Sequence, residues 1–213
     1  MTHSDEVSAR RSTIEDWTAA LAQSTGSPGG GAASGVMLAI AYSLTSMVAG
    51  YTTAEGDRTD ELHALQARAA AGRETALVLA DADAAASESF GSAFRLDRGE
   101  GREEAIREAS VAAAEASATL GTQGIEVVGD LEWLAEHGNP ALIADVAVAV
   151  GALRAAIAGA RANVSFDLAS LSSGGESLED VRERHPVLWG TVQDLDAVLA
   201  RIDRLAGAIE GAT

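Results

Sequence analysis

The apolar residues of this chain recur mainly at intervals of three and four positions, which is the period of an α-helix. The first segment with this pattern covers about 12–23 and opens on Ser12-Thr13-Ile14-Glu15, which has the form of a capping box. A second segment covers about 31–52 and ends at a polar break across 54–58. These patterns predict two helices joined by a short connection rich in glycine.

Longer helical segments follow at about 59–95 and 102–136, with a polar loop between them. Gly121 and Gly124 are positions at which the second of them could bend. Asn139-Pro140 predicts the start of another helix, because a preferred N-cap residue precedes proline at the first helical position. This helix runs to about residue 171, a flexible loop is expected at 172–177, and a last helix follows Pro186.

No segment alternates apolar and polar residues over a useful length, so the sequence predicts an all-α fold, a bundle of long antiparallel helices. Its 213 residues suffice for one domain with a substantial core. We expect a flexible N-terminus at 1–11, without the apolar core of a signal peptide, and a single helical domain at 12–213. These features indicate a cytoplasmic protein.

No charged residue lies between Asp16 and Glu55. The dense apolar part of this segment, at 36–48, is shorter than the roughly 20 residues that a membrane span needs, and it contains polar residues. We therefore expect no membrane partner and a helix that is buried on all sides. Burial of the segment 17–54 against a second copy of the chain would make the protein a homodimer.

The net charge of −17, with no lysine in the chain, argues against a nucleic-acid partner. An anionic substrate would have to be met by individual arginines or by a helix N-terminus. The chain has no cysteine, which excludes disulfides and thiolate zinc sites, and no Glu-x-x-His motif of the di-iron type. We predict no metal site and no tightly bound cofactor.

The turn Ser27-Pro28-Gly29-Gly30-Gly31 precedes the uncharged helix directly. Glycines at a helix start leave the first backbone N–H groups bare, and such groups can bind anions or the polar edge of a heterocycle. The alternative is that these glycines only allow two helices to pack closely. The turn by itself does not separate the two interpretations.

Six motifs stand in a distinctive order along the chain. They are Ser27-Pro28-Gly29-Gly30-Gly31-Ala32, Met47-Val48-Ala49, Leu79-Ala80-Asp81-Ala82-Asp83-Ala84, Phe90, Gly138-Asn139-Pro140-Ala141-Leu142-Ile143-Ala144-Asp145-Val146-Ala147 and Ala162-Asn163-Val164. In order and approximate spacing, across about 12–170, they resemble the cyclodeaminase/cyclohydrolase family. This folate enzyme domain occurs as free-standing methenyltetrahydrofolate cyclohydrolases and as the C-terminal half of formiminotransferase-cyclodeaminases.

The resemblance implies an all-helical bundle that dimerises and takes a tetrahydrofolate derivative as its substrate. The preferred expectation is hydrolysis of 5,10-methenyltetrahydrofolate to 10-formyltetrahydrofolate, because the chain reads as a free-standing domain. Loss of ammonia from 5-formiminotetrahydrofolate is the near alternative. Two others are a site repurposed for a different small nitrogenous substrate, and a non-catalytic helical scaffold.

Two carboxylates are the candidate catalytic residues. Asp83 lies in an alanine-rich helical stretch, where helix propensity gives an exposed Asp no advantage, and Asp81, two residues away, points to another face and is expected to be solvated. Asp145 lies near a helix start, where the helix dipole also favours a carboxylate for structural reasons alone. A carboxylate would stabilise the cationic one-carbon unit and move a proton.

The candidate substrate-binding residues are Pro28, Gly29, Gly30, Gly31, Asn163, Asp167 and Arg161. An inward amide at Asn163, eighteen residues or five turns after Asp145, could bond a pterin edge or merely a neighbouring helix. Arg161 or Arg154 could pair with the anionic substrate tail, or be a surface cation. The family usually carries Asn at the position of Asp167, Ser at that of Ala32 and a basic stretch near 55–58.

Overall fold

The computed structural model describes residues 7–24, 26–172 and 177–212. All regular structure in these ranges is helical, which confirms the all-α prediction. The expected flexible loop at 172–177 falls mostly at 173–176, outside the described residues. The elements are α1 (Ile14–Leu21), α2 (Gly30–Gly50), α3 (Asp57–Phe94), α4 (Glu100–His137), a 3-10 turn η1 (Pro140–Leu142), α5 (Ile143–Leu171), α6 (Leu178–Arg184) and α7 (Pro186–Ala212).

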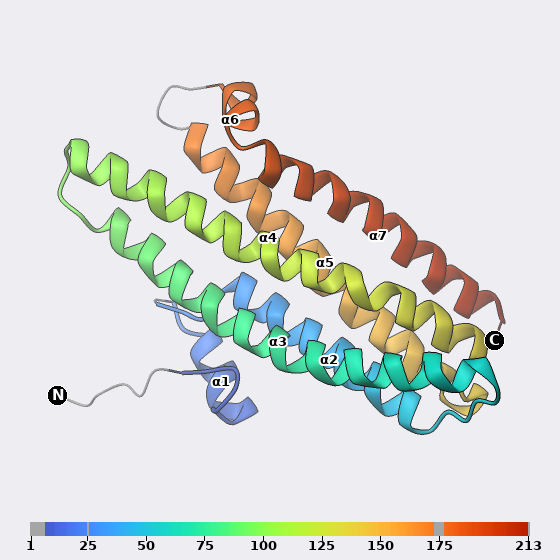
Figure 1. The fold of residues 1–213 in the computed structure, drawn as a ribbon. Coiled ribbons are helices and arrows are strands. Elements are labelled where there is room, and N and C mark those ends of the chain that lie inside the picture. The colour runs from blue at the N-terminus through green and yellow to red at the C-terminus, as the bar shows by residue number, and fades with distance from the viewer. Residues whose placement is uncertain (1–6, 25, 173–176, 213) are drawn as a thin grey trace.

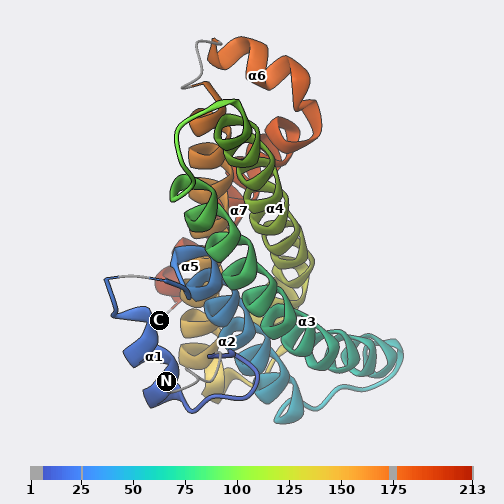
Figure 2. The ribbon, with the colours of Figure 1, turned by 90° about the vertical axis from the view of Figure 1, so that its left-hand side faces the viewer.

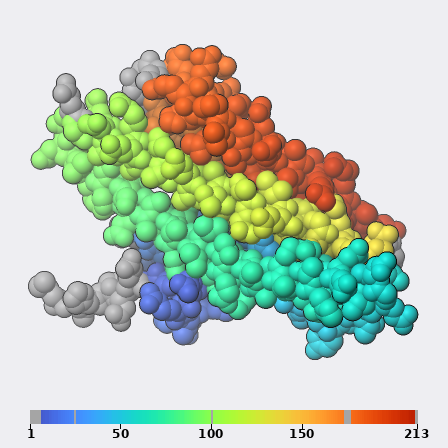
Figure 3. Space-filling model, in the orientation of Figure 1, coloured from blue at the N-terminus to red at the C-terminus, as the bar shows by residue number. Residues whose placement is uncertain are grey.

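Five long helices form the bundle (Figure 1). Helix α2 packs against α3 and α5, α4 packs against α3 and α5, and α7 lies across α5 and α4. Figure 2 shows α2 and α5 next to each other, behind α3 and α4 as these are seen in Figure 1. Figure 3 shows α3, α4 and α7 forming one continuous face, with α1 beside α3. The start of α2 is thereby enclosed by three other helices.

The apolar core runs along the whole bundle. Its largest fully buried side chains include Tyr42, Leu38, Leu131 and Leu153, and Tyr42 satisfies its hydroxyl by donating to the Gln123 carbonyl oxygen at 2.7 Å. A smaller cluster joins α4, α5, α6 and α7 at one end of the bundle: Ala114, Ala118, Val164, Leu168, Val181, Leu188 and Val192. The single-domain prediction, 12–213, is consistent with this arrangement and stays a prediction.

Two local features add to the sequence expectations. Helix α4 continues through Gly121 and Gly124, where it receives Leu195 and Ile157 from neighbouring helices. Helix α6 was not predicted, although Ser177 and Asp180 form a complete capping box at its start. With seven residues it is too short to show a convincing period.

Part of the N-terminal segment that was expected to be flexible is hydrogen-bonded to α3, through Ser8 and Ala9. Residues 1–6 are outside the described residues, but the Ser8 hydroxyl donates to Asp81 Oδ2 at 2.7 Å and the Ala9 N–H donates to Asp81 Oδ1 at 2.6 Å. Asp81 is therefore half-buried and hydrogen-bonded, where a solvated side chain was expected. The contact lies two residues from Asp83 and steadies that part of α3.

Candidate active site

A cavity of about 130 Å³ lies where the start of α2 meets α3, α4 and α5. Four short stretches of sequence supply its walls, and within α3, α4 and α5 the lining residues are spaced by three or four positions, so each group shares one helix face. The lining residues are Gly30, Gly31, Asp83, Ser87, Phe90, Ala113, Ser117, Asn163 and Asp167.

Asp83 is the more enclosed of the two carboxyl groups that line the cavity, with an exposed fraction of 4%. The Ser117 hydroxyl donates to its Oδ1 at 3.0 Å. Its Oδ2 is buried and has no hydrogen-bond partner among the described residues. Burial raises the pKa of the Asp83 carboxyl group, and hydrogen bonding by Ser117, the Ala32 N–H and Ser87 opposes that rise. The free oxygen is a place where a ligand N–H or O–H would bind favourably.

Gly31 is required by this arrangement. A Cβ placed on Gly31 would overlap the carboxylate of Asp83, so only glycine lets α2 begin against that side chain. Gly159 of α5 has the same relation to Ser34, whose hydroxyl oxygen occupies the space of a Cβ. Of the two interpretations of the glycine turn, close packing applies at Gly31. The side chain packed against it, Asp83, is itself a candidate catalytic group.

Asp167 is the second buried carboxyl group of the cavity, with an exposed fraction of 8%. Burial, followed by the negative charge of Asp83, raises the pKa of Asp167 to about 7. No arginine or histidine lines the cavity, so no cation compensates the two carboxyl groups. Among the described residues, no group of three or more acidic or histidine side chains is arranged to hold a metal ion.

The structure brings together five of the predicted site residues: Gly30, Gly31, Asp83, Asn163 and Asp167. Pro28 and Gly29 do not line the cavity. Pro28 is buried just before it, and Gly29 is the N-cap of α2. In the structure they form the turn that leads into Gly31, and their predicted role in binding substrate stays a prediction.

Asp145 does not reach this cavity. It lies in the first turn of α5, while Asn163 is eighteen residues further on. At 1.5 Å per residue the two are about 27 Å apart along the helix. The helical period was read correctly, but sharing a helix face does not place two residues in one site.

The two arginines expected to bind the substrate tail are engaged elsewhere. Arg161 Nε lies 2.8 Å from Asp196 Oδ1, and Arg154 Nε lies 2.6 Å from Asp203 Oδ1. Both pairs are exposed and join α5 to α7. The alternative interpretation of Arg161 and Arg154, as surface cations, describes their positions better.

Sequence reasoning missed Ser87 and Ser117 as site residues, and it did not name Phe90 as one either. Ser87 and Phe90 follow Asp83 by four and seven positions, so the helical period could have placed them on its face. Ser117 comes from α4 and contacts Asp83 only through the tertiary fold. No local pattern marks it.

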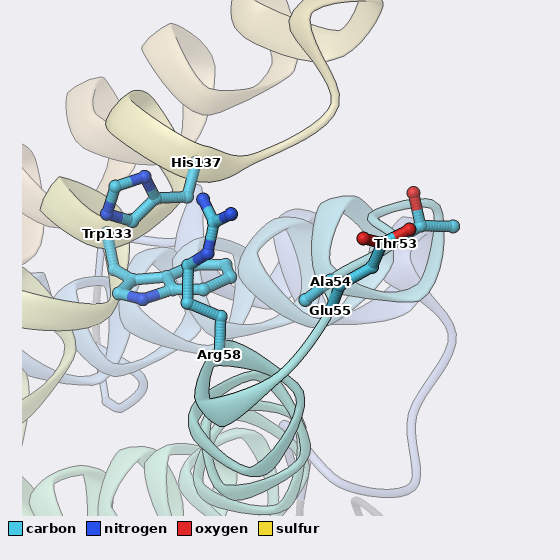
Figure 4. A pocket seen from close by; sticks show the side chains of 6 residues that line it. All are labelled: Thr53, Ala54, Glu55, Arg58, Trp133 and His137. Carbon is cyan, nitrogen blue, oxygen red and sulfur yellow. The ribbon is translucent and has the colours of Figure 1, made fainter.

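A second hollow, of about 210 Å³, lies far from this cavity, between the α2–α3 connection and the end of α4. Figure 4 shows Arg58 extending beside the indole of Trp133 toward His137. Glu55 and Arg58 are both exposed there, and the Trp133 indole N–H donates to Glu61 Oε2 at 2.9 Å. The hollow offers no buried, unsatisfied group, so the cavity at Asp83 is the stronger candidate for chemistry.

Comparison with known proteins agrees with this fold. The formiminotransferase-cyclodeaminase family model matches residues 13–184. The crystal structure of formiminotetrahydrofolate cyclodeaminase from Thermotoga maritima is similar, with a TM-score of 0.79 and 24% sequence identity, over 95% of this chain and 98% of that chain. At this identity the likeness to the solved structure shows a shared fold. No curated protein matches the sequence.

Proposed function

The chain belongs to the formiminotransferase-cyclodeaminase family, and on that premise we propose that its cavity acts on the one-carbon unit of a reduced folate. The observation that carries the proposal is the buried carboxylate of Asp83, which faces the cavity with one oxygen unsatisfied. A fixed, buried anion is well suited to a reaction whose carbon is cationic. Asn163 lies beside it, with an amide that can both donate to and accept from a pterin edge.

The first candidate reaction is hydrolysis of 5,10-methenyltetrahydrofolate. In this substrate the carbon bridges N5 and N10 as an amidinium cation, which the Asp83 carboxylate would stabilise. A water oxygen bonds to the carbon while Asp83 accepts a proton from the water. The bond from the carbon to N5 then breaks, N5 takes up a proton, and the remaining hydroxyl group loses its proton, which gives 10-formyltetrahydrofolate. The cavity volume of about 130 Å³ fits the reacting centre, and the rest of the substrate would extend beyond it.

The second candidate reaction is loss of ammonia from 5-formiminotetrahydrofolate. Its support is the unsatisfied Oδ2 of Asp83, since a buried acceptor without a donor is unfavourable. The formimino group carries N–H donors that could satisfy this oxygen. The methenyl carbon carries none, because N5 and N10 are fully substituted in that compound.

One optical experiment separates the candidates. Purified protein is mixed with each substrate, and the absorbance of 5,10-methenyltetrahydrofolate is followed. Accelerated decay of added methenyl compound supports hydrolysis, whereas its accelerated formation from the formimino compound supports loss of ammonia. No effect on either substrate by folded protein would contradict the folate proposal and leave a repurposed site.

We also propose that the protein is a homodimer through the exposed apolar face of α2 and α5. Both helices are long and apolar enough, by length and composition, to cross a membrane, and in the 18-residue apolar window within 140–171 only 33% of the residues are buried. Exposed apolar side chains occur on both helices: Ile40 and Met47 on α2, with Tyr51 directly after it, and Val148 and Phe166 on α5. Apolar side chains exposed on two helices that pack against each other are typical of an interaction surface, and a second copy of the chain is the occupant that we propose.

Charged substitutions on this face should separate the subunits. We expect Met47→Arg together with Val148→Arg to shift the sedimenting mass from twice the 21.7 kDa chain mass to once that value, because two buried guanidinium groups would face an apolar surface. Val187→Arg is the matched control, since Val187 is 80% exposed on α7 and outside the face. A wild-type monomer at micromolar concentration would contradict the dimer, and sedimentation with lipid vesicles would indicate a membrane instead.

A further inference from the structure

The two buried carboxyl groups of the cavity have unequal surroundings. Asp83 receives a hydrogen bond from the Ser117 hydroxyl, and the Ala32 N–H and Ser87 also favour its charged form. No hydrogen bond to the side-chain oxygens of Asp167 occurs among the described residues, and the Ser170 hydroxyl donates to its backbone carbonyl oxygen at 2.7 Å. Donors stabilise an ionised carboxylate, so the environment favours charge on Asp83 and a proton on Asp167.

The cavity also contains no positively charged side chain that would stabilise both carboxyl groups in their ionised form. The lining residues from α2 are glycines, those from α4 are Ala113 and Ser117, and α5 adds only the neutral Asn163 beside Asp167. On α3, Asp81 is engaged by Ser8 and Ala9, and Glu88 lines a separate hollow together with Asp81. Two like charges in such a site repel each other, and the state with a single shared proton is favoured.

We propose that Asp167 is a second catalytic residue of this chain, an acid that shares one proton with Asp83, the base. The proposal rests on the proposed folate function and adds to it the group that donates a proton. The pKa of Asp167, raised to about 7 by burial and by Asp83, is of the size that such an acid needs near neutral pH.

For loss of ammonia from the protonated formimino group, –CH=NH2+, the proton balance closes within the pair. N10 bonds to the formimino carbon, and the N10 proton passes to Asp83. The bond from this carbon to the formimino nitrogen then breaks, and the nitrogen keeps the bonding electron pair, takes the proton of Asp167 and leaves as ammonia. The pair ends with one proton, as it began, although the proton now sits on Asp83 and must return to Asp167.

For hydrolysis the pair must exchange a proton with solvent. One water proton passes to Asp83 as the water oxygen bonds to the methenyl carbon. When the carbon–N5 bond breaks, N5 keeps the electron pair and takes the proton of Asp167. The remaining hydroxyl proton passes to Asp167 as the formyl group forms. The pair then holds two protons, and one is released to solvent before the next turnover.

The decisive variant is Asp167→Asn, which keeps the shape of the side chain and removes the acid. Asp196→Asn is the matched control, because Asp196 is an exposed carboxylate on α7, outside the cavity. Thermal unfolding of both variants checks that they are folded.

Two readouts test the pair. The first is the pH profile of kcat: wild type should lose activity as the pH rises above about 7, because Asp167 is deprotonated there. Asp167→Asn should lose this alkaline limb and lower kcat by roughly 10²-fold or more. The second readout is the infrared C=O stretch of a protonated carboxyl group near neutral pH, which should be present in wild type and in Asp196→Asn and absent from Asp167→Asn.

The outcomes are distinguishable. An Asp167→Asn enzyme that keeps kcat and the alkaline limb would overturn the catalytic role of Asp167. Turnover by wild type without a protonated carboxyl band would overturn the shared proton. A band that disappears in Asp167→Asn, with no turnover of either folate by wild type, would overturn the proposed function and with it the catalytic role, while leaving the shared proton in place.

Discussion

Asp83→Asn is expected to lower turnover of the folate substrate by roughly 10²- to 10⁴-fold, the range typical of a lost acid–base group. Asparagine keeps the size of the side chain and can still meet the Ser117 hydroxyl with its carbonyl oxygen. It carries no negative charge beside the cationic carbon, and it cannot accept a proton. Initial rates measured with purified variant and wild type, at matched folding by circular dichroism, give the result.

Asp60→Asn is the control for this experiment. Asp60 is an exposed carboxylate in the first turn of the same helix, so its loss changes the net charge equally without touching the cavity. Full activity of Asp83→Asn would remove Asp83 from the mechanism and favour a non-catalytic scaffold. A loss in both variants would point to overall charge and not to the site.

Gly31→Ala is expected to reduce activity at least tenfold, although it adds one methyl group. The new Cβ would overlap the Asp83 carboxylate, so either the carboxylate turns away from Ser117 or the start of α2 moves. A displacement of about 1 Å at a catalytic group is enough for an effect of this size or larger. The measurement is kcat together with the midpoint of thermal unfolding.

The stability of Gly31→Ala should change less than its activity. Alanine favours a helix by about 1 kcal/mol over glycine, whereas overpacking a tight contact destabilises by roughly 1–3 kcal/mol. Gly190→Ala in α7 is the control, because a Cβ there meets no atom within 4 Å. Wild-type kinetics in Gly31→Ala would mean that the contact between α2 and Asp83 is not needed in solution.

Helical periodicity was enough to predict the architecture, because each long helix spans many turns and repeats its apolar pattern. The bounds of α3 at Asp57–Phe94 and of α5 at Ile143–Leu171 lie close to those expected at 59–95 and 140–171. Short elements carry less pattern, which is why α6 was missed. The anchoring of Ser8 on Asp81 spans 73 positions of sequence, and no local signal predicts it.

A site residue could be predicted from the sequence where an unusual residue in a helix is explained by its burial. A carboxylate in an alanine-rich helix is out of place on an exposed face, and Asp83 is indeed buried. Asp145 and Arg161 show the opposite case. Asp145 lies near a helix start, where the helix dipole favours a carboxylate whether or not it belongs to a site. Arg161 has its acidic partner, Asp196, on a helix that the sequence does not place beside it.

The raised pKa of Asp167 also makes the stability of the fold depend on pH. Its carboxyl group has a pKa of about 7 in the folded protein, against 3.8 ordinarily, so the folded state holds this proton more tightly than the unfolded state does. The free energy of unfolding should therefore fall as the pH rises from about 4 to about 7, by at most about 4 kcal/mol for a shift of about three units.

Urea unfolding at pH about 5 and about 8 measures this slope, and Asp167→Asn should flatten it; an equal slope in the variant would assign the effect to other groups. The pKa of Asp83 is also raised by burial, so this group too lowers the free energy of unfolding as the pH rises. A cationic ligand would offset part of this loss, because it stabilises the negative charge of the pair, which burial in the cavity disfavours. Occupancy would then protect the enzyme most in alkaline solution, where the unliganded protein is weakest.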